Sequence, residues 1–498
     1  MRKSAWDLGY DGVLSVCRRV REGRSAILVD RYPPVNLFAL VPKLASEFEP
    51  ELVLLDQLLD DDVIIDRVRA DLARRAPRTR THGRPSTPVE VILRLLVVKR
   101  LYGWSYAEVE HFVGDSLTLR QFCRLYLEPV PDDTTLIRWA HLIAPETLVA
   151  LNDRVVELAR SLRVTRGRKL RVDSTVVETT IHHPTDSRLL GDGVRVLSRL
   201  LRRAKAVVTT EADLPRAVFQ SHTRSVRRLA QRIHRVARRK GEQAAEDLQS
   251  AYRKLVDVAE RTRTQARRVC QVLDAQSDAP AGRLVAQFEY VLPLVEKAIT
   301  QATRRVLAGE VVPAKEKIVS LFEPHTQVIT RHKPGKPVEF GRKLWIDEVD
   351  GGIVSGYRVL EEAGQDYPYL AERLVRHQER FGKPPWLLAG DRGVSSPGNE
   401  RLAEQAGVTR VVLSASGRAS PARRERERER WFRRGQRFRA GIEGRIRVLK
   451  RDYGLGRCPD HGLAGIERWV GWGIVTHNLH TIARTVSQRP QVAVAVAN

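Results

Sequence analysis

The stretch KLRVDSTVVETTIHHPTDSRLLGDGVRVL, from Lys169 to Leu197, decides the fold. Its first part alternates, so that residues 170, 172, 174 and 176 share one face of an extended chain and residues 171, 173, 175 and 177 share the other. Val, Thr and Ile dominate it, which is typical of a strand. The sequence therefore predicts a β-strand, followed by a helix over residues 189–201.

Asp173 breaks the pattern of this predicted strand. Asp is depleted in strands, and burying a carboxylate is costly unless another group pairs with it. Local rules within a consistent segment are broken most often at functional positions. Two interpretations stay open from the strand alone: an edge strand whose Asp faces water, or a functional carboxylate inside a sheet.

The composition indicates a large, basic, globular protein. Its 498 residues favour two to four domains, and 86 Lys and Arg against 60 Asp and Glu give a formal charge of +26. This excess predicts a polyanionic partner, with nucleic acid favoured over a membrane surface. A hydrophobic fraction of 42% is too high for a disordered basic tail.

No membrane or secretory segment is predicted. The N-terminus lacks an apolar signal-peptide core, and Arg94, Lys99 and Arg100 interrupt the most apolar run. The four cysteines are far apart and form no CxxC pair, which disfavours a disulfide scaffold and a zinc knuckle. These features predict a cytoplasmic, nucleoid-associated protein.

Helical patterns dominate the first 160 residues. One helix is predicted over residues 51–72, and its acidic end is interpreted as solvated rather than metal-binding (Asp56, Asp60, Asp61, Asp62). After a basic linker at 74–84, capping boxes at Thr87–Glu90 and Ser105–Glu108 open two more helices, with others expected at 117–126 and 134–143. This pattern suggests a helix-turn-helix-like DNA-binding module, which we expect to help recognise DNA ends. A bundle that only packs or dimerises is the alternative, and the sequence alone hardly favours either.

A long segment without proline, residues 216–279, predicts a helical hairpin that turns near Gly241. Because its charges are of one sign, contact with nucleic acid is at least as good an interpretation as a solvated face. The arginines concerned are Arg224, Arg227, Arg228, Arg232, Arg235, Arg238 and Arg239.

Strand patterns return after residue 317. Residues 338–360 predict a hairpin around Asp350-Gly351-Gly352, and a short buried strand at 386–389 leads to Asp391. Ligands in α/β sheets gather at such strand ends. A helix over residues 422–451 then places Arg439, Glu443, Arg447 and Lys450 on one face, where a surface ion-pair ladder is the alternative interpretation.

Asp173, Asp391 and Glu443 come from different elements and could converge at one end of a mixed sheet. Phosphodiester hydrolysis needs a deprotonated nucleophile and a neutralised leaving oxygen, which two Mg²⁺ or Mn²⁺ ions held by hard oxygen ligands can supply. The three carboxylates are therefore predicted to be both catalytic residues and metal ligands. Arg439, Arg447 and Lys450, with Arg228, Arg232 and Arg235 of the hairpin, are predicted to bind DNA.

At these motifs the chain resembles bacterial insertion-sequence DDE transposases of the ISNCY type. The Asp173 stretch carries the resemblance, together with Arg439, Glu443 and Lys450, which fit a Tyr-two-Arg-three-Glu-six-Lys signature whose Tyr position holds Gln436. The resemblance implies an RNase H-like α/β catalytic core, with a five-stranded mixed sheet flanked by helices, formed by residues 165–200 and 311–485. It also implies an N-terminal helical region at 1–76, an all-α DNA-binding domain at 77–160, a helical hairpin insertion at 201–310 and a flexible tail at 486–498.

Other carboxylates compete for the site. Asp347 and Asp350 are interpreted as turn residues, Asp186 and Asp192 as loop residues, and Glu178 as lying on the face opposite Asp173. The adjacent His182 and His183 are not expected to share one ion, because successive strand residues point to opposite faces.

The function expected is transposition. Such an enzyme binds double-stranded DNA at terminal inverted repeats, cleaves it with metal-activated water, and joins the 3′-OH to target DNA as a dimer or larger assembly on synapsis. A catalytically inactive DNA-binding protein or repressor on the same fold is one alternative. A helical architectural protein coating nucleic acid is another, and the strand-rich region 317–414 argues against it.

Overall fold

The computed structural model describes residues 26–37, 49–75, 84–208, 214–276, 278–333, 336–362, 364, 366–415 and 420–489. Most of the predicted basic linker and most of the predicted tail lie outside these residues. The chain divides into two compact units, residues 1–177 with 343–498, and residues 178–342. These limits differ from the predicted insertion at 201–310, because the end of one strand, a helix and a further strand join the second unit.

Seven strands form one mixed sheet in the described part of the chain: β3 (Lys169–Thr179), β4 (Gln327–Lys333), β5 (Lys336–Val349), β6 (Val354–Val359), β7 (Leu387–Gly390), β8 (Arg410–Leu413) and β9 (Arg457–Cys458). The order is β4-β5-β3-β7-β8, with β6 on β5 and β9 on β3. The pairs β3·β7 and β7·β8 are parallel, whereas β5 is antiparallel to β4 and β6. The predicted mixed α/β class is confirmed, and the sheet has seven strands instead of five.

The β5–β6 hairpin is formed where the sequence predicts it. A 3₁₀ turn at Asp350–Gly352 joins the strands, and Gly351 has φ +81°, which glycine adopts without the penalty of a Cβ. Both carboxylate oxygens of Asp350 accept backbone N–H bonds, from Arg166 at 3.0 Å and Lys169 at 3.1 Å. The turn is therefore tied to the start of β3.

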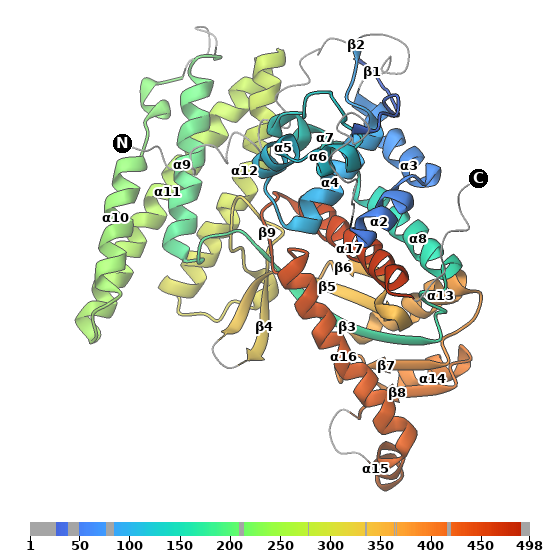
Figure 1. The fold of residues 1–498 in the computed structure, drawn as a ribbon. Coiled ribbons are helices and arrows are strands. Elements are labelled where there is room, and N and C mark those ends of the chain that lie inside the picture. The colour runs from blue at the N-terminus through green and yellow to red at the C-terminus, as the bar shows by residue number, and fades with distance from the viewer. Residues whose placement is uncertain are drawn as a thin grey trace. The chain divides into compact units, whose positions relative to one another are not determined.

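Helices pack around the sheet of the first unit (Figure 1): α8 (Pro145–Ser161), α13 (Leu370–Phe381), α14 (Pro397–Gln405), α15 (Pro421–Arg428), α16 (Arg430–Asp452) and α17 (Leu463–Ser487). A 3₁₀ turn, η7 (Tyr367–Tyr369), directly precedes α13. Helix α17 is buried as predicted. Its Asn478 side chain accepts from Val354 N and donates to Val354 O, at 2.9 and 2.8 Å. Asn152 of α8 also donates to Val354 O, at 3.2 Å. These bonds satisfy the backbone of Val354 and fix α17 against β6.

The predicted helix at 51–72 is two helices, α2 (Pro50–Leu59) and α3 (Asp62–Leu72). Asp61 caps α3 by accepting from Ile64 N at 3.1 Å, and it also pairs with Arg154. Asp56 and Asp60 bind the fully buried Arg94 at 2.6 and 2.7 Å. The interpretation of a solvated end is therefore wrong for Asp56 and Asp61, which are largely buried against arginines, because a desolvated guanidinium requires anionic partners. It holds for Asp62, whose side chain is 82% exposed.

Four helices follow: α4 (Val89–Tyr102), α5 (Tyr106–Asp115), α6 (Leu117–Phe122) and α7 (Asp133–Leu142). The Ser105–Glu108 capping box is confirmed. The one predicted at Thr87–Glu90 is wrong, because Pro88 is the N-cap and Glu90 instead accepts from Arg94 at 3.0 Å. The predicted all-α region also contains a short parallel pair of strands, β1 (Ala26–Ile27) and β2 (Arg84–Pro85).

The second unit contains α9 (Asp186–Ala204), α10 (Thr223–Val236), α11 (Glu242–Gln276) and α12 (Ala279–Ala302), which pack side by side (Figure 1). The predicted hairpin is therefore half of a helical bundle, and it turns at Gly241, whose φ is +106°. Asp186 and Asp192 lie in α9, so their assignment to a loop is wrong. Asp186 is buried and accepts bonds from Gln301 and Arg305, both at 2.8 Å.

No helix in the described residues is both long and apolar enough to cross a membrane.

Candidate functional site

Asp173 occupies the centre of the sheet. Strand β3 lies between β5 and β7, which excludes the edge-strand interpretation, and Asp173 is only 9% exposed. Its Oδ1 accepts a 2.7 Å bond from the backbone N–H of Ser174. Water solvates a carboxylate buried to this degree poorly, so its charged form is disfavoured unless a cation approaches.

Asp391 is the second carboxylate at this end of the sheet. It follows β7 directly, and the parallel register pairs Val172 with Gly390, so each Asp is the next residue along its own chain segment. Burial and the negative charge of Asp391 together raise the pKa of Asp173 to about 6. The structure thus brings these two predicted residues together.

Asp366 is a third carboxylate here, and it is absent from the set predicted from the sequence. It lies between β6 and α13, is 5% exposed, and accepts a 2.8 Å bond from Ser174 Oγ. Its charge also contributes to the raised pKa of Asp173. Lys343 Nζ, on β5, lies 2.7 Å from Asp366 Oδ1 and neutralises part of this cluster. One sequence signal could have identified Asp366: it is a carboxylate in the connection that follows a strand of the sheet and leads into a helix.

Gly393 shows that Asp391 and Asp366 face one small space. A Cβ built on this glycine would lie 3.2 Å from Asp391 Oδ1 and 3.5 Å from Asp366 Oδ2. The Asp391 side chain is itself held by a 3.1 Å bond from Val394 N. A side chain at position 393 would therefore intrude between the two carboxylates, and glycine avoids this.

Helix α16 lies close against β3, β7 and β8 because two of its residues are glycines (Figure 1). A Cβ on Gly435 would collide with Val412, and one on Gly441 would collide with the Arg171 guanidinium. Arg171 Nη1 donates to Phe438 O at 2.6 Å. Since Arg171 and Asp173 share a face of β3, the helix covers the face that carries the candidate carboxylate.

Glu443 does not join the cluster directly. Its side chain is 68% exposed and lies 3.4 Å from Arg439, one helical turn earlier. Arg439 in turn lowers the pKa of Asp173, which places its positive charge near that carboxylate. The surface ion pair considered from the sequence is therefore present, and Arg439 links Glu443 to the acidic cluster.

The fit to divalent cations is partial. Asp173 and Asp391 are hard oxygen donors whose mutual repulsion a cation would relieve, and Asp366 is a third such donor. Across the residues that the structure describes, no three His, Cys, Asp or Glu side chains are arranged ready to hold an ion. Asp173 and Asp391 could hold one, whereas Glu443 would have to exchange Arg439 for it.

The predicted DNA-binding residues differ in availability. Arg447 is exposed, Lys450 is half-buried, and Arg439 is engaged with Glu443. Arg228, Arg232 and Arg235 are all exposed on α10, as are the other arginines of that face. Residues 214–241 contain no Asp or Glu, so no acidic side chain of this segment offsets the positive charge of the arginines.

Part of the chain is similar to known protein sequences. Residues 39–142 match a family described as Transposase domain (DUF772). An uncharacterized protein, ORF8 in the nfe locus of Rhizobium meliloti, is 30% identical over 161 residues, which span 31% of this chain and 73% of that protein. The chain belongs to the family of this rhizobial protein. No solved structure matches it.

Within the matched transposase domain, the helices α4–α7 have little free positive charge. Residues 89–143 hold seven acidic and six Lys or Arg side chains. Of these six, Arg138 alone is exposed, and Arg100 stacks on Trp469 with 3.4 Å between its guanidinium carbon and the ring centroid. Phosphate contact from these four helices is therefore limited, and the predicted role of the module in recognising DNA ends stays a prediction.

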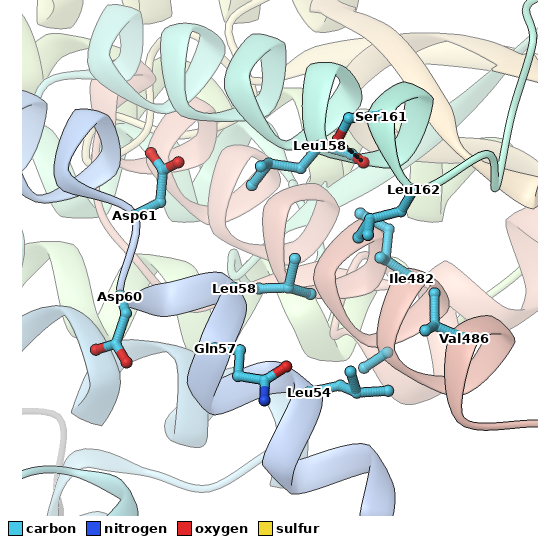
Figure 2. Close-up of a pocket in the computed structure, with 11 residues that line it drawn as sticks. Leu54, Gln57, Leu58, Asp60, Asp61, Leu158, Ser161, Leu162, Ile482 and Val486 are labelled. Atoms are coloured by element: carbon cyan, nitrogen blue, oxygen red, sulfur yellow. Dashed lines mark hydrogen bonds between the residues drawn. The ribbon is translucent and has the colours of Figure 1, made fainter. Parts of the chain in front are cut away.

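A pocket of about 320 Å³ lies among α2, α8 and α17 (Figure 2). Leu58 lies at its centre, with Ile482 and Val486 on one side and Asp60 and Asp61 at the opposite end. Both aspartates are already paired with arginines. The pocket shares no residue with the acidic cluster, and we assign it no part in the chemistry.

The raised pKa of Asp173 predicts that Asp173→Asn stabilises the metal-free protein. A folded-state pKa of about 6 against an ordinary 3.8 means that ionisation opposes folding. The cost should be absent below about pH 4, grow between pH 4 and 6, and stay constant above, at on the order of 3 kcal/mol. Urea unfolding in EDTA at pH 4 and pH 8 measures it, and an equal effect of the substitution at both values would contradict the assignment.

Proposed function

We propose that the protein is a DNA transposase of an insertion sequence, which binds terminal inverted repeats, cleaves the element ends and joins the 3′-OH to target DNA. The observation that carries the proposal is the pairing of Asp173 and Asp391 at adjacent strands beneath the helix of Glu443, in a chain whose residues 39–142 match a transposase domain. The central position of β3, with antiparallel strands on one side and parallel strands on the other, supports an RNase H-like core.

The proposed roles follow from the positions of the side chains. Asp173 and Asp391 would hold the divalent cations, through which the scissile phosphate would be oriented, and Glu443 would complete the site by exchanging Arg439 for a cation. Two bound Mg²⁺ or Mn²⁺ ions would supply the activated nucleophile and neutralise the leaving oxygen. Arg439, released from Glu443, then faces the DNA backbone together with Arg447 and Lys450. The low exposure of Asp173 limits competing water and strengthens the local electrostatics.

Phosphate binding is assigned mainly to α10. Its arginines recur three and four residues apart along 14 residues, so they form a continuous cationic face. Synapsis of two ends would bring two or more copies together, and chromosomal DNA would place the protein at the nucleoid in the cytoplasm. The repressor alternative needs the same DNA surface and no acidic site, so nothing in the cluster geometry favours it.

Replacing Arg228, Arg232 and Arg235 together with Gln should reduce the salt dependence of DNA binding. Each arginine that no longer neutralises a phosphate lowers the slope of log affinity against log salt by about 0.9, so the slope of the triple variant should fall by up to about 3. Fluorescence anisotropy with a DNA duplex between roughly 50 and 200 mM salt measures the slope.

A matched control removes the same charge from the neighbouring helix. Arg253, Lys254 and Arg268 of α11 are also exposed, but Asp257 lies within one turn of the first two. Their triple Gln variant should change the slope by less than half as much. Equal reductions in both variants would mean that net charge, rather than the α10 surface, determines binding.

Strand cleavage tests the proposed function. The full chain, incubated with Mg²⁺ and a duplex carrying one end of the element, should nick the end, whereas EDTA should prevent it. Binding of the end without cleavage, in Mg²⁺ and in Mn²⁺, would favour the repressor alternative instead.

A further inference from the structure

A chain of polar contacts extends from β5 to the candidate carboxylate on β3. Lys343 Nζ donates to Gly364 O at 2.9 Å and lies 2.7 Å from Asp366 Oδ1. Asp366 Oδ2 accepts from Ser174 Oγ at 2.8 Å, and Ser174 N donates to Asp173 Oδ1 at 2.7 Å. Ser174 thus connects the two aspartates, by its side chain to one and by its backbone to the other.

These contacts restrict how Asp173 can move. The bond from Ser174 N selects one orientation of the Asp173 carboxylate, and the bond from Ser174 Oγ to Asp366 fixes the strand at that position. Lys343 is 12% exposed and holds Asp366 from the neighbouring strand. Hydrogen bonds of this kind, one layer behind a metal ligand, orient the ligand, and their removal changes metal affinity by about 10- to 100-fold.

Folding alone does not account for Asp366. Its carboxylate is 5% exposed, shares the space at Gly393 with Asp391, and connects to Asp173 through Ser174. Like charges held together in a low-dielectric interior destabilise the empty protein and favour a bound cation. Lys343 compensates part of this negative charge, which leaves the remainder for a bound cation.

We propose that Asp366 is a positioning residue of the catalytic site, which acts through Ser174 to hold Asp173 in the orientation that receives a divalent cation. Lys343 is the counter-ion that holds Asp366 in place. The inference rests on the proposed function, since it assigns Asp366 to the same acidic site. It differs from that proposal in naming residues outside the predicted set of Asp173, Asp391 and Glu443.

The test is a titration of the full chain with Mn²⁺ in the absence of DNA, which requires no turnover. Asp366→Asn should weaken Mn²⁺ binding by about 10- to 100-fold, because the Lys343 charge is left uncompensated beside the site. Ser174→Ala keeps that charge balance but removes the bond, and it should weaken binding about tenfold. Ser174→Thr keeps a hydroxyl and suits a strand, so it should bind Mn²⁺ as the unsubstituted protein does.

Asp350→Asn is the matched control, because Asp350 also accepts two hydrogen bonds at the edge of the same sheet but lies in the β5–β6 turn. It should leave Mn²⁺ affinity unchanged. Suppose that Asp173→Asn abolishes Mn²⁺ binding but that Asp366→Asn and Ser174→Ala leave the affinity unchanged. This result would overturn the role of Asp366 and leave the proposed metal site standing. A chain that binds no Mn²⁺, or binds it equally after Asp173→Asn, would overturn the proposed metal site as well.

Discussion

Glu443→Gln protein is expected to cleave element ends at least about a thousandfold more slowly than the unsubstituted chain while binding the same DNA with similar affinity. The substitution preserves size and helix propensity but removes one negative charge from the proposed metal site. Metal-assisted charge stabilisation is worth several kcal/mol in such reactions, and about 4 kcal/mol corresponds to a thousandfold in rate. Single-turnover nicking of a labelled duplex, with anisotropy for binding, separates the two effects.

Asp173→Asn and Asp391→Asn should lose cleavage to the same degree. Loss of the exposed pair between Glu443 and Arg439 costs at most about 0.5 kcal/mol, so misfolding cannot explain an inactive Glu443→Gln protein. Glu443 and Asp366 are the two candidates for the third metal ligand, and cleavage by Asp366→Asn protein distinguishes them. Normal cleavage by Glu443→Gln, with none by Asp366→Asn, would make Asp366 the third ligand and leave Glu443 a surface residue.

Much of the sheet was predictable because its signals are local. The alternating run around Asp173 predicts β3, the Asp-Gly-Gly turn predicts the β5–β6 hairpin, and the apolar run before Asp391 predicts β7; all three are observed. The adjacency of Asp173 and Asp391 followed from the expectation that carboxyl ends of strands gather ligands. The register of β3 and β7 pairs Val172 with Gly390, the residues just before the two aspartates.

The incorrect predictions concern residues whose partners are far away in the sequence. Asp366 accepts a hydrogen bond from Ser174, which is 192 residues away in the sequence, and no local pattern predicts such a contact. Asp56 and Asp60 fit an exposed helix end until the buried Arg94 is placed beside them. Charge in the sequence therefore predicts a solvated face only where no buried counter-charge is packed against it.

Asp347 is the clearest such error. Its proximity to the Asp350 turn suggested a turn residue, but it lies within β5 and is buried. Its Oδ1 accepts from Trp345 Nε1 and its Oδ2 from Arg373 Nε, both at 2.6 Å, and a second guanidinium nitrogen of Arg373 pairs with Oδ2. The Arg373 side chain is fully buried, so Asp347 compensates its charge.

Asp347→Asn should therefore destabilise the protein by about 3–5 kcal/mol, because it leaves the Arg373 guanidinium charged and buried, with the half-exposed Glu372 at 3.8 Å as its remaining ion pair among the described residues. Urea unfolding at pH 7.5 and 25 °C measures the loss, with Glu443→Gln as an exposed control expected within about 0.5 kcal/mol. Asp347→Asn combined with Arg373→Met should recover most of the loss, since an apolar replacement of a buried pair is often neutral. A double variant as unstable as Asp347→Asn alone would show that the aspartate stabilises β5 through Trp345 rather than through Arg373.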